Sequence, residues 1–265
     1  MSRFDNLEFE AGSAVRRRAS AGLGNGTPVR DAAFFQAAGL EEFRQGHLEA
    51  ALRDYSRALE RDRMLIECWL MQVRILTELD EHKEACIWAD KALEMFPHHP
   101  DLLAAKAIAA ARMRRLNEAL ACSDEAMSQR GATPLAWLSR GEVLLARESR
   151  MATHCLGRAL AECAGASLRA WMELEASRVL RRYGRFSQAL SHASAAAAAL
   201  PHYAPVHVER GLCQAALGLP DAAVSFEQAL ELDHGCDEAR RALAQIEHQN
   251  LWSGLRRFMR RLGGR

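Results

Sequence analysis

Residues 49–59 read EAALRDYSRAL, residues 83–93 read KEACIWADKAL, and residues 117–127 read NEALACSDEAM. Each stretch has an alanine, a second alanine seven residues later, and then a large apolar residue. The first alanines are residues 51, 85 and 119, so the pattern recurs every 34 residues. Three looser copies follow, with first alanines at residues 152, 189 and 222. Such a regular period predicts a solenoid built from one repeated supersecondary unit.

The repeated unit resembles the tetratricopeptide repeat, a helix–turn–helix of 34 residues. In that family, a bulky residue and a small residue four positions later mark the first helix. These marks stand at Phe35 with Gly39, Trp69 with Val73, Leu103 with Ala107, Trp137 with Gly141, and His207 with Gly211. In the fifth copy, Trp171 lies two positions early for the bulky site. The resemblance implies an all-α solenoid of about six tandem helix–turn–helix repeats.

Packing within such an array follows from the sizes of the repeated residues. We expect small residues such as Gly39 and Ala51 where the two helices of a repeat cross, and large ones such as Tyr55 between successive repeats. One helix pair cannot bury its apolar face alone, so pairs stack. No segment shows a sustained alternation of apolar and polar residues with β-branched side chains, as a strand does. Helix N-caps are expected at Asp31, Asn117 and Asp221, and turns at Gly46, Gly184 and Gly218.

The two ends of the chain differ from the repeats and suggest three regions. Residues 1–31 are rich in glycine, alanine and serine, which predicts a flexible tail. Within this tail Phe4, Leu7 and Phe9 alternate with acidic residues, so it is either an inert tail or a docking motif. Residues 32–236 form the predicted solenoid. Residues 237–265 are predicted to be one helix, in which Leu243 and Ile246 cover the last repeat.

The last part of that helix carries an apolar stripe between arginines. A basic amphipathic helix can be a capping helix with a solvated face, a docking element for a partner, or a membrane-surface element. The sequence leaves these alternatives open. The residues in question are Trp252, Leu255, Arg256, Arg257, Phe258, Arg260 and Arg261.

Composition restricts the partners and the compartment. The net charge of +1 gives no general field for nucleic acid, so no nucleic-acid partner is expected. The seven cysteines form no CxxC pair, and no apolar stretch approaches the ~20 residues of a membrane span, so we expect a cytoplasmic protein. The richness in arginine over lysine suggests a bacterial genome of high GC content.

No catalytic, phosphate-binding or metal-binding motif is present in the sequence. The glycines of residues 22–26 follow no predicted strand and precede no GK[ST], and neither GxSxG nor HExxH occurs. We therefore expect a protein that is not an enzyme and that holds neither cofactor nor metal.

The resemblance also implies a binding groove lined by the first helix of each repeat. An apolar floor with a few arginines would suit an amphipathic helix or an extended apolar segment with acidic flanks. We therefore expect a scaffold or adaptor that binds a protein or peptide partner in this groove. The alternative is a peripheral membrane or self-assembling protein, recruited through the basic C-terminal helix, and a homo-oligomer stays open. The expected groove residues are Gln36, Leu40, Phe43, Leu70, Arg74, Ile108, Arg112, Leu138, Glu142, Trp171, Arg178 and Arg181.

Overall fold

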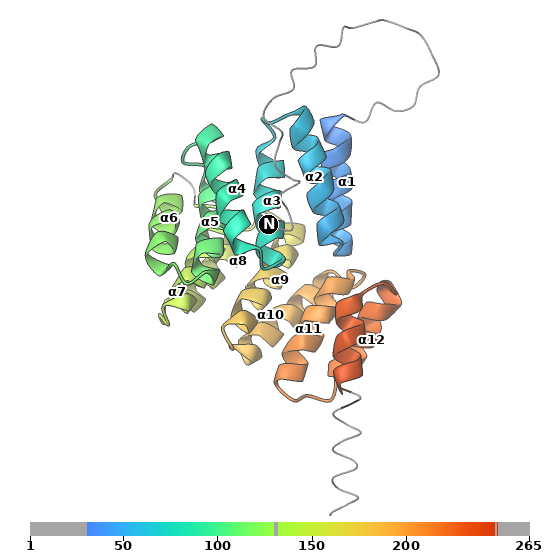
Figure 1. The fold of residues 1–265 in the computed structure, drawn as a ribbon. Coiled ribbons are helices and arrows are strands. Elements are labelled where there is room, and N and C mark those ends of the chain that lie inside the picture. The colour runs from blue at the N-terminus through green and yellow to red at the C-terminus, as the bar shows by residue number, and fades with distance from the viewer. Residues whose placement is uncertain (1–30, 130–131, 247, 249–265) are drawn as a thin grey trace, which may run out of the picture.

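The computed structural model of the chain describes residues 31–129, 132–246 and 248 (Figure 1). These residues form helices joined by short turns, and no strand occurs among them. The α-helices are α1 (Ala32–Gln45), α2 (Leu48–Arg61), α3 (Ile66–Glu78), α4 (His82–Met95), α5 (Pro100–Arg112), α6 (Leu116–Ser128), α7 (Pro134–Ala146), α8 (Ala152–Ala161), α9 (Ala166–Arg182), α10 (Phe186–Ala199), α11 (Ala204–Ala216) and α12 (Ala222–Leu232). Residues 237–246 are helical as well.

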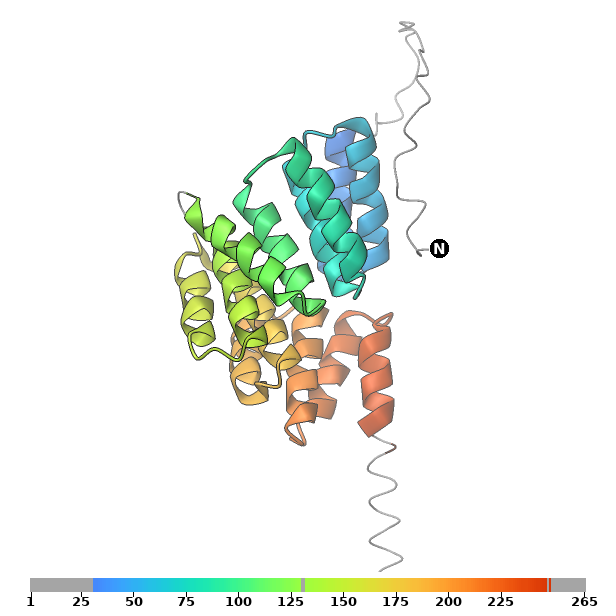
Figure 2. The same cartoon turned by 60° about the vertical axis from the view of Figure 1, so that its left-hand side comes forward.

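Consecutive helices pair and the pairs stack, so the predicted all-α solenoid is confirmed (Figure 2). Each odd-numbered helix packs antiparallel to the even-numbered helix that follows it. Along the array, α3 packs on α5, α5 on α7, α7 on α9, and α9 on α11. The odd-numbered helices line the inner side of the curved array. Among the described residues, no helix combines the length and apolar character that crossing a bilayer requires.

Glycine allows the two helices of a repeat to approach closely. A Cβ atom added to Gly39 would lie 3.2 Å from the ring of Tyr55, and one added to Gly211 would lie 2.7 Å from the ring of Phe226. Tyr55 is almost fully buried. Besides its expected place between successive repeats, the ring of Tyr55 packs on the glycine of its own repeat.

The turns inside the repeats share one backbone conformation. Gly46, Asp80, Arg114 and Glu148 follow one another at intervals of 34 residues, and all four have positive φ angles, of 84°, 60°, 64° and 59°. Gly184 and Gly218 continue the series with φ angles of 72° and 67°. Glycine adopts this left-handed region without penalty, whereas other residues are strained there. The turn therefore keeps the same left-handed backbone conformation in each repeat, even where the residue is not a glycine.

The predicted helix starts are partly confirmed. Asp31 caps α1, because its carboxylate accepts a hydrogen bond of 2.8 Å from the backbone N–H of Phe34. The prediction for Asn117 is wrong. Helix α6 begins at Leu116 after Arg115, so Asn117 already lies in the first turn. Asp221 precedes α12 as expected, but its side chain makes no capping hydrogen bond.

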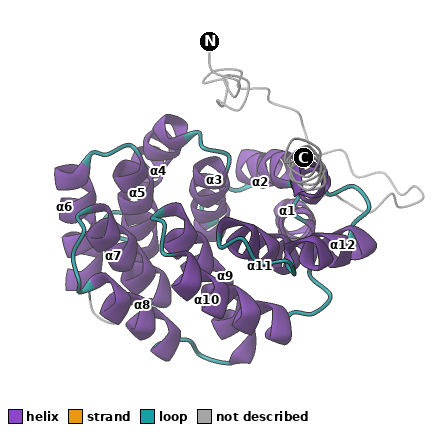
Figure 3. Ribbon diagram, turned by 90° about the horizontal axis from the view of Figure 1, so that it is seen from below, coloured by secondary structure: helices purple, strands orange, loops and turns teal. Residues whose placement is uncertain are grey.

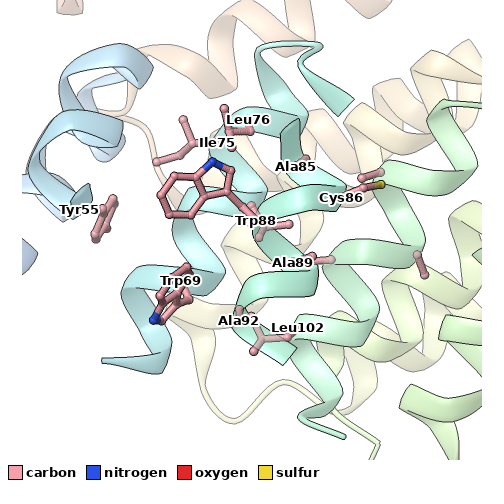
Figure 4. Close-up of a cluster of buried hydrophobic side chains, with 14 of the residues drawn as sticks. Tyr55, Trp69, Ile75, Leu76, Ala85, Cys86, Trp88, Ala89, Ala92 and Leu102 are labelled. Atoms are coloured by element: carbon pink, nitrogen blue, oxygen red, sulfur yellow. The ribbon is translucent and has the colours of Figure 1, made fainter. Parts of the chain in front are cut away.

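Large aromatic residues contribute to the core of the first repeats. Trp69 of α3 and Trp88 of α4 pack with ring centroids 5.5 Å apart, next to Leu76 and Ala89 (Figure 4). Most of the remaining core is aliphatic or alanine, as the low aromatic content predicts.

The curvature of the array brings its two ends together. In Figure 1 and Figure 3, α1 and α2 lie next to α11 and α12, although about 160 residues separate them in sequence. The hydroxyl of Tyr203 donates a hydrogen bond of 3.4 Å to the backbone carbonyl of Phe43. The solenoid therefore closes on itself within six helix pairs.

Candidate interaction site

The inner side of the array contains a buried group of charges, which we call the inner charge network: Arg112, Glu78 and Glu142. Arg112 donates from Nε to Glu142 Oε1 at 2.9 Å and from Nη1 to Glu78 Oε1 at 3.1 Å. It also donates to the backbone carbonyl of Thr77 at 3.1 Å. The side chain of Arg112 is 4% exposed and that of Glu142 is fully buried. These bonds join α3, α5 and α7.

Burial and neighbouring charges act on the pKa of Glu78 in opposite directions. Burial alone would raise the pKa of Glu78, but the positive charges of Arg112 and Arg178 outweigh that effect and hold the pKa at about 2. Oε2 of Glu142 is buried without a hydrogen-bond partner in the protein. It borders a cavity of about 20 Å³, which has room for about one water molecule.

A second group, which we call the aromatic cluster, comprises Phe43, Trp171 and Tyr203. The rings of Phe43 and Trp171 stack with centroids 6.2 Å apart and an angle of 29° between their planes. The edge of the Tyr203 ring meets Trp171 with centroids 4.8 Å apart. Helix α9 is thereby joined to α1, at the opposite end of the array, and to the start of α11.

Ion pairs accompany the aromatic cluster. Arg74 of α3 lies 3.4 Å from the carboxylate of Glu175 on α9, and the guanidinium carbon of Arg74 lies 6.0 Å from the ring centroid of Phe43. Arg182, at the end of α9, contacts Asp80 at 3.4 Å. These pairs connect the fifth repeat to the second. Arg178 pairs within α9 with Glu175.

A large cleft lies where the two ends of the array meet, and we call it the end cleft. Its volume is about 1080 Å³. Tyr203, Pro205, Val208 and Leu212 of α11 and its preceding turn give it an apolar part. Charged residues surround that part: Glu49, Arg53, Glu78, Asp80, Arg178, Arg181, Arg182, Glu209, Asp233, Asp237, Glu238 and Arg241.

The structure separates the predicted groove residues into three groups. Ile108, Arg112, Leu138 and Glu142 are buried on the inner side and line the small cavity together with Arg74. Arg178 and Arg181 line the end cleft, and Phe43 lines both spaces. The others are Gln36 and Leu40, which lie on α1 and line neither space, Trp171 in the aromatic cluster, and Leu70, which packs against the core.

The predicted C-terminal docking residues lie outside the described part of the chain. They are Trp252, Leu255, Arg256, Arg257, Phe258, Arg260 and Arg261. The same holds for the tail residues Phe4, Leu7 and Phe9.

The cysteines of the described repeats are free, and most are buried. Burial raises the pKa of Cys68 to about 12 and that of Cys86 to about 11, which keeps both thiols protonated and unreactive. Within residues 31–129 and 132–246, no three His, Cys, Asp or Glu side chains gather as metal ligands would.

Comparison with known proteins agrees with this geometry. Residues 37–100 match the sequence model of the tetratricopeptide repeat. These residues therefore contain tetratricopeptide repeats, and the described part of the chain has the fold of a tetratricopeptide-repeat solenoid. Comparison with curated protein sequences gives no match. Proteins of this family are in general interaction scaffolds with concave binding surfaces and no catalytic activity of their own.

Several solved structures of tetratricopeptide-repeat proteins have a similar fold. A thermophilic protein of Thermus thermophilus is 20% identical, with 71% of this chain and 100% of that chain covered and a TM-score of 0.55. A repeat protein from Parabacteroides merdae is 17% identical, with 82% and 85% covered and a TM-score of 0.52.

A third similar structure is the Cut9–Hcn1 hetero-tetramer of the APC/C. It is 15% identical, with 81% of this chain covered and a TM-score of 0.52. The chain spans 42% of the length of that relative. At such identities the likeness concerns the fold alone.

Sequence reasoning did not find the end cleft, because its residues come from both ends of the array. Asp80 and Arg182 lie 102 residues apart, and Phe43 and Tyr203 lie 160 apart. One signal was available: Trp171 stands out of register in the fifth repeat. That displaced residue is the centre of the aromatic cluster.

Proposed function

We propose that this protein is an interaction scaffold that binds a segment of a partner protein in the end cleft. The observation that carries the proposal is the cleft itself, with a volume of about 1080 Å³ between the first and last repeats. This volume lies at the upper end of the range of typical small-molecule sites, about 300–1,000 Å³, so the end cleft has room for a peptide segment. The protein would act without catalysis of its own.

The chemistry of the end cleft supports a protein ligand. Val208 and Leu212 lie in its apolar part, and charged residues such as Arg53 and Glu238 surround them. An apolar centre with a polar rim is the usual anatomy of a protein interface. Arg53 and Glu238 are exposed, so a partner can reach both.

General properties of the family support the same function. Solenoid repeats offer extended concave surfaces to their partners. The similar Cut9–Hcn1 structure is a hetero-tetramer, in which a protein of this fold is part of an assembly. The free cysteines of the described repeats are consistent with a reducing compartment, and we propose a cytoplasmic location for this reason.

Selection of peptides from a displayed library against the purified full chain tests the proposal. Peptides that bind the wild type should lose affinity for the variants Leu212→Glu and Arg53→Glu. We expect a loss of about tenfold or more for Leu212→Glu, because a carboxylate would enter the apolar part of the cleft without a partner. We expect about fivefold for Arg53→Glu, a charge on the rim.

Two matched controls lie outside the cleft. Val224→Glu places the same carboxylate on an apolar residue of α12 that is 51% exposed, and Arg150→Glu reverses an exposed arginine at the turn before α8. Neither residue lines the end cleft. Both variants should bind the peptides as the wild type does. Peptides that bind all four variants equally would show that the partner surface lies elsewhere.

A further inference from the structure

Helix α9 presents an aromatic residue and a carboxylate to the inner side of the first two repeats. Trp171 and Glu175 lie four residues apart, so they share one face of the helix. The face is directed to Phe43 of α1 and Arg74 of α3. Trp171 stacks on Phe43, and the carboxylate of Glu175 lies 3.4 Å from the guanidinium of Arg74.

The receiving surface consists of residues that interact with each other as well. The guanidinium carbon of Arg74 lies 6.0 Å from the centroid of the Phe43 ring. A stacked aromatic ring next to an arginine is a surface that recognises an aromatic group and an anion together. In this structure α9 fills that surface from within the same chain.

We propose that Phe43 and Arg74 form a second partner surface, which Trp171 and Glu175 cover in the closed array. The partner that fits is a helical segment with an aromatic residue and a carboxylate one turn apart. This inference rests on the proposed scaffold function, and it adds the regulation of that site. A partner of this kind competes with α9 and releases the fifth repeat from the first two.

The contacts that close the array include an exposed ion pair, which can be released. Phe43 and Trp171 belong to different ends of the solenoid, and Arg182 and Asp80 form an ion pair with side chains 37% and 70% exposed. Exposed ion pairs contribute little and are screened by salt. Helix α9 itself keeps its own partner α10 and its neighbours α7 and α11, so it can move without unfolding.

Release of α9 would also connect the end cleft with the small inner cavity. Phe43 and Glu78 line both the end cleft and the small inner cavity. When the contact between Phe43 and Trp171 opens, the end cleft continues to Ile108 and Leu138 on the inner side. A partner segment then has a continuous groove, as the family resemblance implies.

The test uses the full chain and two readouts, the shape in solution and binding of a defined probe. The probe is a synthetic peptide with the sequence of residues 166–182, which is α9 itself, and the control peptide carries alanine in place of its tryptophan. In the variant Trp171→Ala, small-angle scattering should give a larger radius of gyration than in the wild type. This variant should bind the probe at least about tenfold more tightly than the wild type, in which the surface is covered.

A second variant keeps the proposal falsifiable if Trp171→Ala does not fold. Arg182→Asp opposes two carboxylates and should also increase the radius of gyration, whereas the double variant Arg182→Asp with Asp80→Arg should restore it. An arginine is tolerated in that turn, because Arg114 occupies the equivalent position with a φ of 64°. An unchanged radius in the folded variants, or equal binding of both peptides, would overturn the proposal. Neither result would affect peptide binding that depends on Arg53, which tests the end cleft.

Discussion

Helices α3, α5 and α7 pack in the order of the sequence, whereas α9 packs on α7 and also contacts α1 and α3 from the other end of the array. We call the stack of α3, α5 and α7 the in-order stack. It is joined by Arg112, whose side chain is almost fully buried between two carboxylates. The contacts of α9 with the first two repeats are mixed, because Phe43 and Glu175 are buried whereas the pair of Arg182 with Asp80 is exposed. Two regions of one array are therefore held together by different kinds of contact.

We expect the two kinds of contact to differ in their effects on stability and on shape. Buried charges that lose a partner are expensive, because the remaining charge cannot be solvated. Exposed pairs contribute little, since water and salt replace them. Changes in the inner charge network should therefore lower the free energy of unfolding, whereas changes in the contacts between α9 and the first two repeats should mainly alter the shape of the array.

The largest effect is expected for Arg112→Ala. This variant leaves Glu142 fully buried and without a cation, so the free energy of unfolding should fall by about 3–5 kcal/mol. The matched variant Arg182→Ala removes an arginine from the exposed pair with Asp80 and should cost at most about 1 kcal/mol. Urea denaturation followed by circular dichroism measures both. Equal losses would contradict the distinction between the two regions.

Acid should weaken the in-order stack. The pKa of Glu78 is about 2 in the folded protein, below its ordinary value of 4.5. The unfolded chain binds the proton more tightly, so the stabilisation is complete above pH ~4.5 and is lost as the pH falls from ~4.5 to ~2. Over this window the contribution of Glu78 should decrease by roughly 2–3 kcal/mol.

The variant Glu78→Gln isolates this contribution. Its free energy of unfolding should be lower than that of the wild type at neutral pH, and the difference should shrink as the pH falls. Denaturation curves at several pH values measure the difference. A difference that is constant with pH would mean that Glu78 is not held in its charged form by Arg112.

Replacing a glycine by alanine should destabilise the protein where the two helices of a repeat cross closely. In Gly211→Ala the new Cβ would lie 2.7 Å from Phe226, so we expect a loss of about 1–3 kcal/mol from overpacking. In Gly157→Ala the Cβ meets nothing within 4 Å, so the variant should gain up to about 1 kcal/mol from helix propensity. Thermal denaturation should shift in opposite directions for the two variants, and a shift in the same direction would contradict the crossing geometry.

The smallest effect is expected in the turns. Glu148 is exposed and has a φ of 59°, where its counterpart in the first repeat is Gly46. Glu148→Gly should relieve backbone strain and stabilise the protein by about 0.5 kcal/mol, whereas Glu148→Ala should bring no such gain. A thermal shift assay on the two variants measures this difference. Equal melting temperatures would mean that the turn is not strained.

Much of the fold could be predicted from the sequence, because the repeat period fixes which helices are neighbours. The alanines at 51, 85 and 119 and the glycines at 39, 141 and 211 mark helix crossings that depend on local spacing. The return of α9 to α1 could not be predicted in this way. It depends on small angles between neighbouring pairs that accumulate along the array, and no local pattern specifies their sum.

Less of the candidate site than of the fold could be predicted. The family resemblance implies that Arg112 and Glu142 face the inner side, and the structure places them there. Their burial could not be predicted, since it depends on how closely α3, α5 and α7 pack around Arg112. The residues of the end cleft from 233 to 241 carried no recognisable motif in the sequence, whereas those from 203 to 212 belong to the sixth repeat, which His207 and Gly211 mark.

The central claim is that the contacts of α9 with the first two repeats close the array. The distance between the two ends of the array in solution tests this claim most directly. Spin labels at residues 53 and 241, which both line the end cleft, report this distance by pulsed electron paramagnetic resonance. The half-buried Cys163 and Cys236 are replaced by serine beforehand. The closed array predicts one narrow distance distribution in the wild type and a shift to longer distances in Trp171→Ala. A broad, long distribution in the wild type, unchanged by Trp171→Ala, would contradict the account.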